Sequence, residues 1–499
     1  MPLADFEVVA YSEAYLRDVL GDSHAVDYLC DYLRDIKAAS IVLEGRYVDR
    51  HYLGDFSAYY SRSFSAPVTQ CRRLHFFDSD VATTKGAFES AYKDQDARSA
   101  SEKLLDEHYL GFVVVRPLVG ARVGRTVLRT YPPDGFRRFQ VVRSYRVNLA
   151  GLRLKIDGLA YQQQDGGAAV CASTALWSAL QRVAFVAGHR TPTPSMITAA
   201  SKSPFPASHG LSDIEMAAAL SSLGYVADQF VPTENRPLFR AKLIASLESN
   251  LPVVLSMEKE LETGAGKIMA GHAVTVTGYR DGGIAADVPS PAPNRSPIPM
   301  RRAGVTVIYV HDDNLGSHAH YELFDSPDLD IAGYETIKLR RGPSNRTVPA
   351  WWDVDEWTIV SALVPKPEKM RMPIDALFSD ILDLRTLVER VFVGVNVNYS
   401  ARFCSGVDYK GTLFGKNFEI ADVANVQQHL SLPRYVGIVS ISTESHLCDF
   451  VLDVSEVPRE PGNPSVLAII APGVPRNSIA QASLGIVALH FDCPLIVSR

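Results

Sequence analysis

The spacing of hydrophobic and polar residues divides the chain into three regions whose predicted elements differ. In the first region, 1–150, apolar residues recur at helical spacing near 12–36 and 83–106. Runs rich in β-branched and aromatic residues predict strands at 41–48, 110–118, 126–131 and 139–147. This N-terminal region is therefore expected to be mixed α/β.

The middle region, 151–365, begins with helical patterns and ends with strand patterns. Helices are predicted at 170–188, 211–223 and 236–249, and strands at 252–258, 272–280, 304–312 and 356–364. Helices followed by antiparallel strands indicate an α+β fold with two packed halves. Residues 286–304 contain several prolines, which cannot continue a central strand, so a long exposed hairpin excursion is expected there.

The last region, 366–499, follows a proline-containing turn at 365–373. A helix is predicted at 373–392, and short strands follow it, among them 435–442 and 465–471. The chain is thus expected to hold three domains, and the C-terminal one is an α+β domain with no role indicated by its residues.

Composition and charge narrow the class of protein. Hydrophobic residues make up 46% of the chain and charged residues 21%, and the net charge is −6, so the chain as a whole is not a polyanion binder. The stretch 116–155 is locally basic, but a solvated strand face, or pairing with acids elsewhere in the chain, is favoured over binding of a nucleic acid or an acidic partner. No apolar run reaches the roughly 18 residues that a membrane helix needs, and no secretory signal is recognised.

The six cysteines are scattered through the chain without a CxxC pair. This spacing excludes a small disulfide scaffold and a zinc ribbon, and it favours a reducing, cytoplasmic location. His311, His318 and His320 invite a zinc site, but their spacing fits no strong zinc signature. No metal and no cofactor are therefore expected, and the oligomeric state is not indicated.

Cys171 has surroundings that suggest chemistry. It stands at the start of an apolar helix, after the loop Gln162–Gly167. The positive end of a helix stabilises a thiolate, and the free N–H groups there can bind an oxyanion. A glutamine amide in the loop can supply a second oxyanion donor, either Gln164 or Gln163.

His272 is the expected base for this nucleophile. It follows Gly271 at the predicted mouth of a strand, and the next predicted strand ends in Asp312, Asp313 and Asn314. An acid at that strand end can accept a hydrogen bond from the imidazole Nδ1–H and fix its tautomer.

The motifs appear in a characteristic order. A Gln-rich loop comes first, and the sequence CASTALWSAL follows it. A helix that begins after Gly-Leu and ends at Gly-Tyr comes next. The sequences LPVVLSM and GHAVTVTGY follow, and then a strand that ends in Asp. Over about 160–320 this order resembles the papain-like cysteine peptidase superfamily, and it looks closest to the bacterial branch that includes the double-glycine leader peptidases. The resemblance implies a papain-like core, with Cys171 as nucleophile, His272 as base and acid, Asp312 as orienting acid and Gln164 as oxyanion donor.

Three features depart from the pattern of that family. Asp165 occupies the place where the family usually has its glutamine, and Val170 and Ala172 flank the cysteine. The separation of His272 from Asp312 is lengthened by the proline-rich segment. These departures keep Gln163 and Asp313 open as alternatives to Gln164 and Asp312.

The expected function is that of a free-standing, cytoplasmic cysteine protease that hydrolyses a peptide or isopeptide bond in a protein or peptide substrate. Amidase or acyl-transfer chemistry on the same scaffold is an open variant, because a fold does not fix a substrate. The alternative is a catalytically degenerate papain-like scaffold that acts as a protein-binding module.

Overall fold

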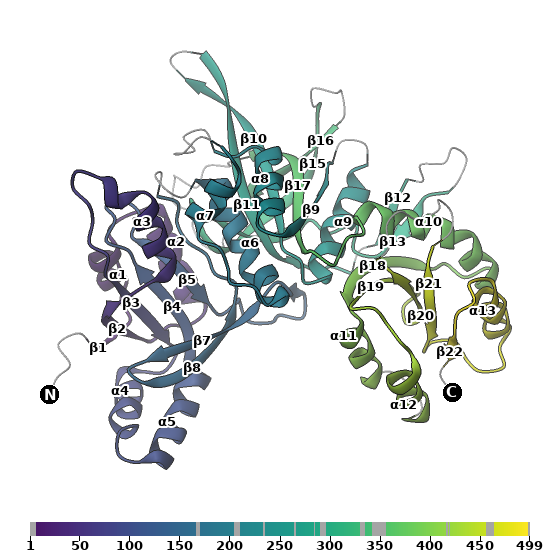
Figure 1. The fold of residues 1–499 in the computed structure, drawn as a ribbon, viewed down its shortest axis with the longest axis horizontal. Helices are drawn as coiled ribbons and strands as arrows, with labels where there is room; N and C mark the ends of the chain where they lie inside the picture. Colours follow the sequence, from purple (N-terminus) through teal and green to yellow (C-terminus); the bar gives the residue numbers. More distant parts are fainter. Residues whose placement is uncertain are drawn as a thin grey trace.

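The computed structural model describes residues 6–165, 170–203, 210–232, 235–263, 266–283, 285–289, 296–329, 335–341, 356–415, 418, 420–455 and 464–497. These residues form thirteen α-helices and twenty-two strands, and most strand pairs are antiparallel. The α+β class predicted from the sequence is confirmed. Figure 1 shows an N-terminal lobe at one end of the molecule, a central lobe, and a C-terminal lobe at the other end.

The N-terminal lobe is built on a five-stranded antiparallel sheet in chain order. Its strands are β1 (Phe6–Ala10), β2 (Ser40–Tyr47), β3 (Cys71–Phe77), β4 (Tyr109–Val115) and β5 (Val123–Leu128), and its helices are α1 (Glu13–Leu20), α2 (His24–Asp35), α3 (Arg50–Ala58), the 3₁₀ turn Tyr60–Arg62, α4 (Val81–Ser90) and α5 (Gln95–His108).

Both long helical patterns of this lobe are interrupted. Gly21 ends α1 with a φ of 81°, and Ser23 caps α2 through its side chain. Asp94 caps α5 in the same way. A glycine with a left-handed backbone ends a helix, and a polar N-cap residue begins the next one. The pattern at 12–36 therefore forms α1 and α2, and the pattern at 83–106 forms α4 and α5.

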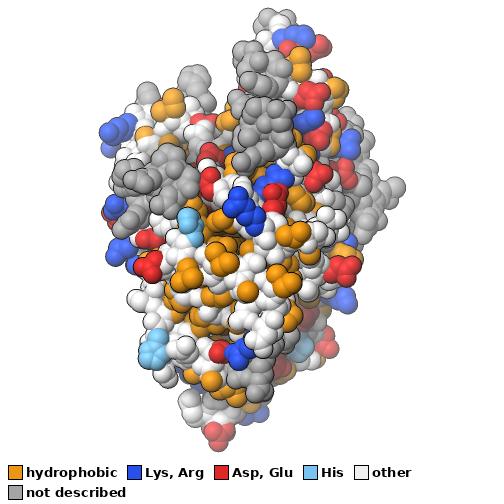
Figure 2. Space-filling model, turned by 90° about the vertical axis from the view of Figure 1, so that its right-hand side faces the viewer, with side chains coloured by type: hydrophobic (Ala, Val, Ile, Leu, Met, Phe, Trp, Pro, Cys, Tyr) orange, Lys and Arg blue, Asp and Glu red, His pale blue; other side chains and the backbone are white. Residues whose placement is uncertain are grey.

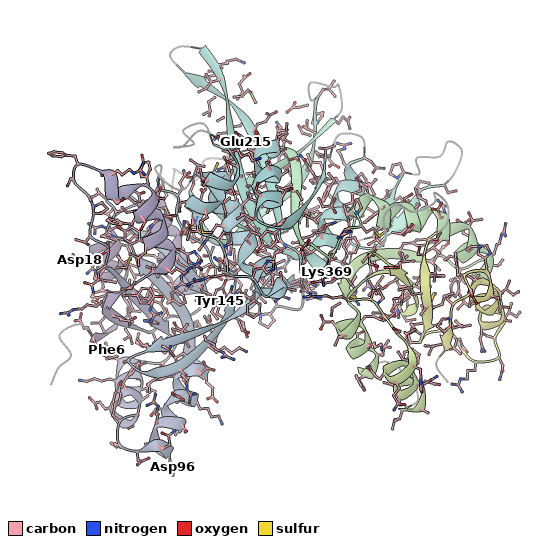
Figure 3. All side chains as sticks on the ribbon, in the orientation of Figure 1. Phe6, Asp18, Asp96, Tyr145, Glu215 and Lys369 are labelled. Carbon is pink, nitrogen blue, oxygen red and sulfur yellow. The ribbon has the colours of Figure 1, made fainter. Side chains whose placement is uncertain are left out.

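A hairpin of β7 (Arg143–Leu149) and β8 (Leu152–Gly158) lies where the N-terminal lobe meets the central lobe. Its turn falls at the expected boundary near residue 150. Tyr145 of β7 lies at this contact (Figure 3): its hydroxyl accepts a bond from the Ala160 N–H at 3.0 Å and donates to Gln181 of the central lobe at 3.4 Å. One hydrophobic core runs through this contact, while the division into independent domains stays a prediction.

The central lobe holds an eight-stranded sheet whose main path closes on itself. The path runs β10-β11-β14-β15-β16-β17-β9, β10 also pairs with β17, and β6 (Arg137–Arg138) pairs with β11. The strands are β9 (Tyr225–Phe230), β10 (Val253–Thr263), β11 (Gly266–Arg280), β14 (Val307–Asp312), β15 (Gly316–Leu329), β16 (Glu335–Arg341) and β17 (Glu356–Pro367). The sequence patterns missed β9, β15 and β16, which carry many polar residues.

The helices of the central lobe pack against this sheet (Figure 1). They are α6 (Cys171–Ala187), α7 (Pro194–Ala200), α8 (Asp213–Ser222) and α9 (Arg236–Glu248). Helix α6 lies against β11 and β17 and is buried along most of its length. An almost wholly apolar helix requires such cover on several sides, which its sequence predicts.

The C-terminal lobe contains a seven-stranded sheet in the order β12-β13-β18-β19-β20-β21-β22. Helices α10 (Ile374–Val391) and α13 (Ile479–His490) share one hydrophobic core with it, and α11 (Gly406–Gly411) and α12 (Ile420–His429) contribute to another. The remaining elements are β18 (Asn398–Ser405), the 3₁₀ turn Thr412–Gly415, β19 (Tyr435–Ser442), β20 (His446–Asp453), β21 (Val466–Ala471) and β22 (Leu495–Val497).

The proline-rich segment contributes two strands to the C-terminal sheet. Strand β12 (Ala286–Val288) pairs with β13 (Ile298–Met300), and β13 pairs in parallel with β18. Val288, Ile298 and Met300 are buried. The expectation of an exposed excursion over 286–304 is therefore wrong for these strands, because their apolar side chains find cover on a neighbouring sheet; residues 290–295 lie outside the described residues.

The far end of the C-terminal lobe exposes hydrophobic side chains. Figure 2 shows them gathered on that face, where α13 exposes Ile479, Ile486 and Leu489. No helix within the described ranges is long and apolar enough to cross a membrane.

A buried ion pair joins the central and C-terminal lobes. The Lys366 ammonium donates to Asp228 Oδ2 at 2.8 Å and to the Met372 carbonyl at 2.7 Å. The same Asp228 oxygen accepts the Ile374 N–H at the start of α10, at 2.8 Å. Asp228 thus fixes the end of β17 and the beginning of α10 together.

We expect Asp228→Ala to lower the free energy of unfolding by about 3–5 kcal/mol, because it leaves the Lys366 charge buried without a partner. Urea denaturation at neutral pH measures this loss. The matched control is Glu260→Ala, which breaks an exposed 2.5 Å ion pair with Lys267 and should cost under about 1 kcal/mol. Equal losses in the two variants would contradict a structural role for the buried pair.

Candidate active site

Cys171 is the first residue of α6. Val170 precedes the helix in an extended conformation, with φ −88° and ψ 163°, and no side chain of the described residues caps the helix. The thiol is half-buried against the hydrophobic core that surrounds α6. The N–H groups of the first helical turn have no partner within a helix, so this end of α6 suits a thiolate or an oxyanion.

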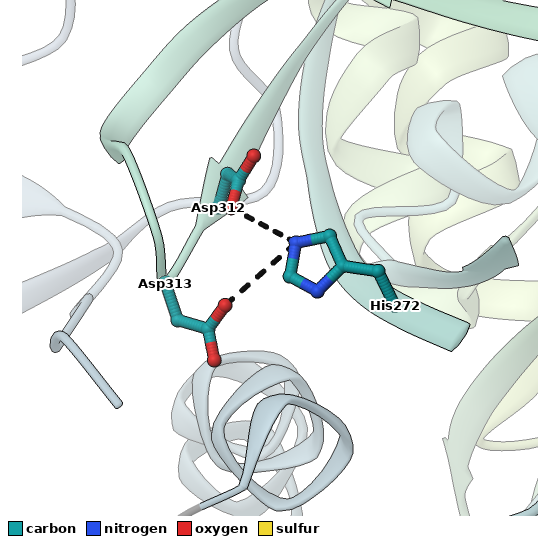
Figure 4. A group of neighbouring side chains, drawn as sticks. All are labelled: His272, Asp312 and Asp313. Carbon is teal, nitrogen blue, oxygen red and sulfur yellow. Dashed lines mark hydrogen bonds and ion pairs between the residues drawn. The ribbon is translucent and has the colours of Figure 1, made fainter. Parts of the chain in front are cut away.

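His272 lies on β11 and is buried. Its Nε2 atom is 3.0 Å from Asp312 Oδ1 and 3.8 Å from Asp313 Oδ1, as Figure 4 shows. Cys171 lies close enough to His272 for its side chain to raise the pKa of the imidazole. Because Nε2 faces the carboxylates, Nδ1 is the ring nitrogen left for the thiol.

Two details differ from the sequence expectation. Strand β11 begins at Gly266, so His272 lies within it and not at its mouth; residues before His272 continue the pairing with β10. The carboxylate contacts Nε2 instead of the expected Nδ1. Ring orientation is set by packing on both sides of the imidazole, which a sequence pattern does not contain.

A hydrogen bond holds α6 and β11 in register at this site. The Thr275 hydroxyl, on the same strand as His272, donates to the Ala175 carbonyl on α6 at 2.7 Å. Both residues are buried. This contact fixes the helix that starts at Cys171 against the strand that carries His272.

Asp312 is the last residue of β14 and is buried. The Tyr321 hydroxyl donates to its Oδ2 at 2.5 Å, and the Asn314 N–H donates to its Oδ1 at 3.0 Å. Burial alone would raise the pKa of Asp312, but His272 and Tyr321 hold it well below its usual range. Tyr321 lies on β15, a strand that the sequence pattern missed.

Charge favours the imidazolium at this site. Burial would lower the pKa of His272, but Asp312, Cys171 and Asp313 together raise it well above 6.5. The ring of Trp357 also lies 5.4 Å from the imidazole, between ring centres. The Nε2 atom lies within hydrogen-bonding distance of Asp312 Oδ1, at 3.0 Å, so a proton on Nε2 can be donated to this carboxylate.

Asp313 reaches the same imidazole from the turn after β14, where strand alternation has ended. It is buried, and neither carboxylate oxygen has a hydrogen-bond partner among the described residues. Burial raises the pKa of Asp313 to about 7, and the negative charge of Asp312 contributes to this rise. The charge of His272 opposes it. Of the two acids left open by the sequence, Asp312 makes the hydrogen bond and Asp313 the longer contact.

The glutamine loop lies beside these acids. Gln164 Nε2 donates to the Asn314 side chain at 2.7 Å, and Gln163 Nε2 donates to the Gly120 carbonyl at 3.4 Å. Asp165 is buried 3.5 Å from the Arg116 guanidinium. Residues 166–169 lie outside the described residues, so the structure places Gln164 next to Asn314 and describes no bond from it to Cys171.

A cleft of about 600 Å³ opens on the acidic side of the site. Its walls are the start of α2, the turn at 119–121, the glutamine loop and the turn that carries Asp313; the lining residues are Ser23, His24, Ala25, Val119, Gly120, Ala121, Gln163, Gln164, Asp165, Asp313 and Asn314. A larger apolar cavity of about 760 Å³ lies between α9 and α10, and it is lined by none of these residues.

Two of the three histidines that invited a zinc site are hydrogen-bonded elsewhere. His311 Nε2 lies 3.1 Å from the Leu159 carbonyl, and His318 Nδ1 lies 2.9 Å from the Thr277 hydroxyl. Burial lowers the pKa of His311, His318 and His320. Within the described residues, the side chains grouped closely enough to hold a metal ion are His272, Asp312 and Asp313.

The basic stretch 116–155 pairs with acids, as its composition suggested. Besides Arg116, Arg125 lies 2.9 Å from Asp49, and Arg153 lies 3.7 Å from Glu102. These contacts neutralise part of the charge of the stretch within the chain itself.

The sequence matches no protein-family model and no curated protein. A function for this chain therefore has to be argued from the residues of the site and from the order of its motifs.

We expect Asp312→Asn to lower the pKa of His272 by at least about one unit, because the charge that stabilises the imidazolium is lost while the burial that opposes it remains. Nuclear magnetic resonance of selectively labelled histidine side chains measures this pKa. The control is Asp287→Asn, an exposed position on β12. An unchanged His272 pKa in Asp312→Asn would contradict the ion pair.

The same pair fixes how stability depends on pH. His272 has a raised folded-state pKa, so its contribution is complete below about pH 6.5 and is lost as pH rises through the folded value. Asp312 has a lowered pKa, so its contribution is present above about pH 4 and is lost as pH falls through its folded value. The free energy of unfolding that is lost in Asp312→Asn should therefore be largest between about pH 4 and about pH 6.5.

Proposed function

We propose that this chain is a cysteine hydrolase that cleaves a peptide or isopeptide bond. Cys171 is its nucleophile, His272 its general base and acid, and Asp312 the residue that orients the imidazole. The observation that carries the proposal is a cysteine at a helix start beside a buried imidazole, whose Nε2 atom lies 3.0 Å from the Asp312 carboxylate.

The proposed reaction follows from these positions. The Cys171 sulfur attacks the substrate carbonyl carbon while its proton resides on His272, and the carbonyl oxygen becomes an oxyanion. His272 then gives that proton to the leaving nitrogen as the carbon–nitrogen bond breaks, which leaves an acyl group on sulfur. Water attacks the acyl carbon with His272 as base, and the acid product and the free thiol are released.

The architecture supports a papain-like assignment. A helix that begins with a cysteine packs on an antiparallel sheet that supplies a histidine and an aspartate from neighbouring strands. Together with the motif order over about 160–320, this favours a relative of the bacterial double-glycine leader peptidases. The proposed partner is a protein or peptide substrate, and free cysteines at all six positions are compatible with a cytoplasmic location.

The oxyanion is proposed to lie at the N-terminus of α6, with Gln164 as the additional donor. Its amide already lies on the acidic side of the site through Asn314, whereas the Gln163 backbone is bound to β5 through the Val123 carbonyl.

Alkylation of the thiols tests the proposal first. At pH 6, Cys171 should react far faster than Cys404 and Cys493, whose pKa values burial raises to about 11. Cys404 and Cys493 are matched internal controls, because both are half-buried like Cys171. His272→Ala should abolish the advantage, since the thiolate then loses its imidazolium partner. Mass mapping after timed alkylation gives each rate.

Equal reactivity of Cys171 in the parent and in His272→Ala would overturn the proposed pair. The degenerate scaffold that binds proteins without cleaving them would then be the better account of the fold.

Hydrolysis of a peptide library tests the oxyanion assignment. Gln164→Ala should lower kcat/KM by about 100-fold on the best substrate, the usual effect of losing one oxyanion donor. Gln163→Ala is the matched control and should have a much smaller effect. A larger loss in Gln163→Ala would reverse the two assignments.

A further inference from the structure

His272, Asp312 and Asp313 bring one imidazole nitrogen and two carboxylates into a small buried space. One ligand atom from each residue lies within 4.8 Å of the others. The two acids carry two negative charges when ionised, whereas the imidazolium supplies one positive charge. With both acids ionised, the site has an excess of buried negative charge that a cation can balance.

Asp313 provides a second, independent observation. Its carboxylate is buried and points toward His272 (Figure 4), yet neither oxygen accepts a hydrogen bond among the described residues. Buried carboxylates are normally satisfied by donors or by a metal ion. The cleft of about 600 Å³ reaches Asp313 and offers a path from solvent.

We propose that His272 Nε2, Asp312 and Asp313 form a binding site for a divalent transition-metal ion of the zinc type. Occupation of this site and the thiol–imidazole–carboxylate chain exclude each other, because both use Nε2. This mutual exclusion rests on the proposed function, whereas the binding site itself does not.

The two separations from Nε2 to the carboxylates are close to those of a zinc site. Zinc bonds of about 2.0–2.2 Å to nitrogen and oxygen in a tetrahedron place the ligand atoms about 3.4 Å apart. Nε2 lies 3.0 Å from one carboxylate oxygen and 3.8 Å from the other, on either side of that value. Calcium and magnesium are disfavoured, because they require more oxygen ligands and do not favour an imidazole.

Neighbouring groups support the same ligand set. Tyr321 donates to Oδ2 of Asp312 and so leaves Oδ1 directed at Nε2. A metal-bound imidazole normally donates its other N–H to an acceptor, and with Nε2 on the metal this N–H is that of Nδ1. The fourth position is left for water from the cleft.

Binding would change the state of the imidazole. The metal needs the lone pair on Nε2, so the proton that Asp312 accepts must leave when the ion enters. The imidazole then cannot serve as the imidazolium partner of a thiolate. Zinc is therefore expected to suppress the reactivity of Cys171 reversibly, and a chelator should restore it.

Calorimetric titration of the full, chelator-treated chain with Zn²⁺ tests the site. Asp313→Asn should weaken zinc binding by at least about tenfold, whereas Cys171→Ala should retain it. His429→Ala, which removes an exposed histidine on α12, controls for adventitious surface binding and should match the parent. Parent-like affinity in Asp313→Asn, or loss of binding in Cys171→Ala, overturns the proposal.

Co²⁺ absorption of the parent chain keeps the test independent of how the variants fold. Nitrogen and oxygen ligands should give visible bands without a sulfur-to-cobalt charge-transfer band. A charge-transfer band would place the ion on Cys171 and overturn the proposed ligand set.

Alkylation with and without Zn²⁺ separates the two proposals. Zinc should slow alkylation of Cys171 in the parent in proportion to the bound fraction, and Asp313→Asn should need more zinc for the same relative effect. If zinc binds through Asp313 while Cys171 is inert throughout, the metal site stands and the hydrolase proposal fails. If Cys171 is reactive and zinc does not bind, the metal site fails and the hydrolase proposal stands.

Discussion

The buried contact between His272 and Asp312 is the interaction on which the site depends. A charged imidazole inside a protein is stable when a carboxylate balances it, and that carboxylate is stable when its second oxygen is also bound. Tyr321 supplies that bond at 2.5 Å. Three strands of one antiparallel sheet therefore have to be in register to bring His272, Asp312 and Tyr321 together, and the Thr275–Ala175 bond ties α6 to that sheet.

The sequence predicted the parts of the site that depend on local pattern. A polar loop before an apolar helix located Cys171 at the helix start, and a valine-rich strand ending in acids located Asp312. It could not predict which imidazole nitrogen faces the acid, because packing around the ring decides this. It also missed β15 and Tyr321, since the polar residues of that strand are paired across the sheet and leave no simple alternation.

Long-range structure accounts for the other differences. The prolines between β12 and β13 indicated an exposed excursion, but a few apolar residues beside them are buried by a sheet whose strands come much later in the chain, with Met300 paired to Tyr399. Likewise, histidines whose spacing hinted at metal are used as internal hydrogen-bonding groups, whereas the acids that converge on His272 include one from a turn. Proximity in the folded chain, and not spacing, brings that group together.

Strands β12 and β13 have a consequence for how this protein is organised. They lie in the segment between β11, which carries His272, and β14, which ends at Asp312, and they belong to the C-terminal sheet. The C-terminal lobe thus draws two edge strands from a loop of the central lobe. Removing the C-terminal lobe would leave the apolar side chains of this hairpin without the sheet that covers them. The two lobes are therefore expected to have been inherited together.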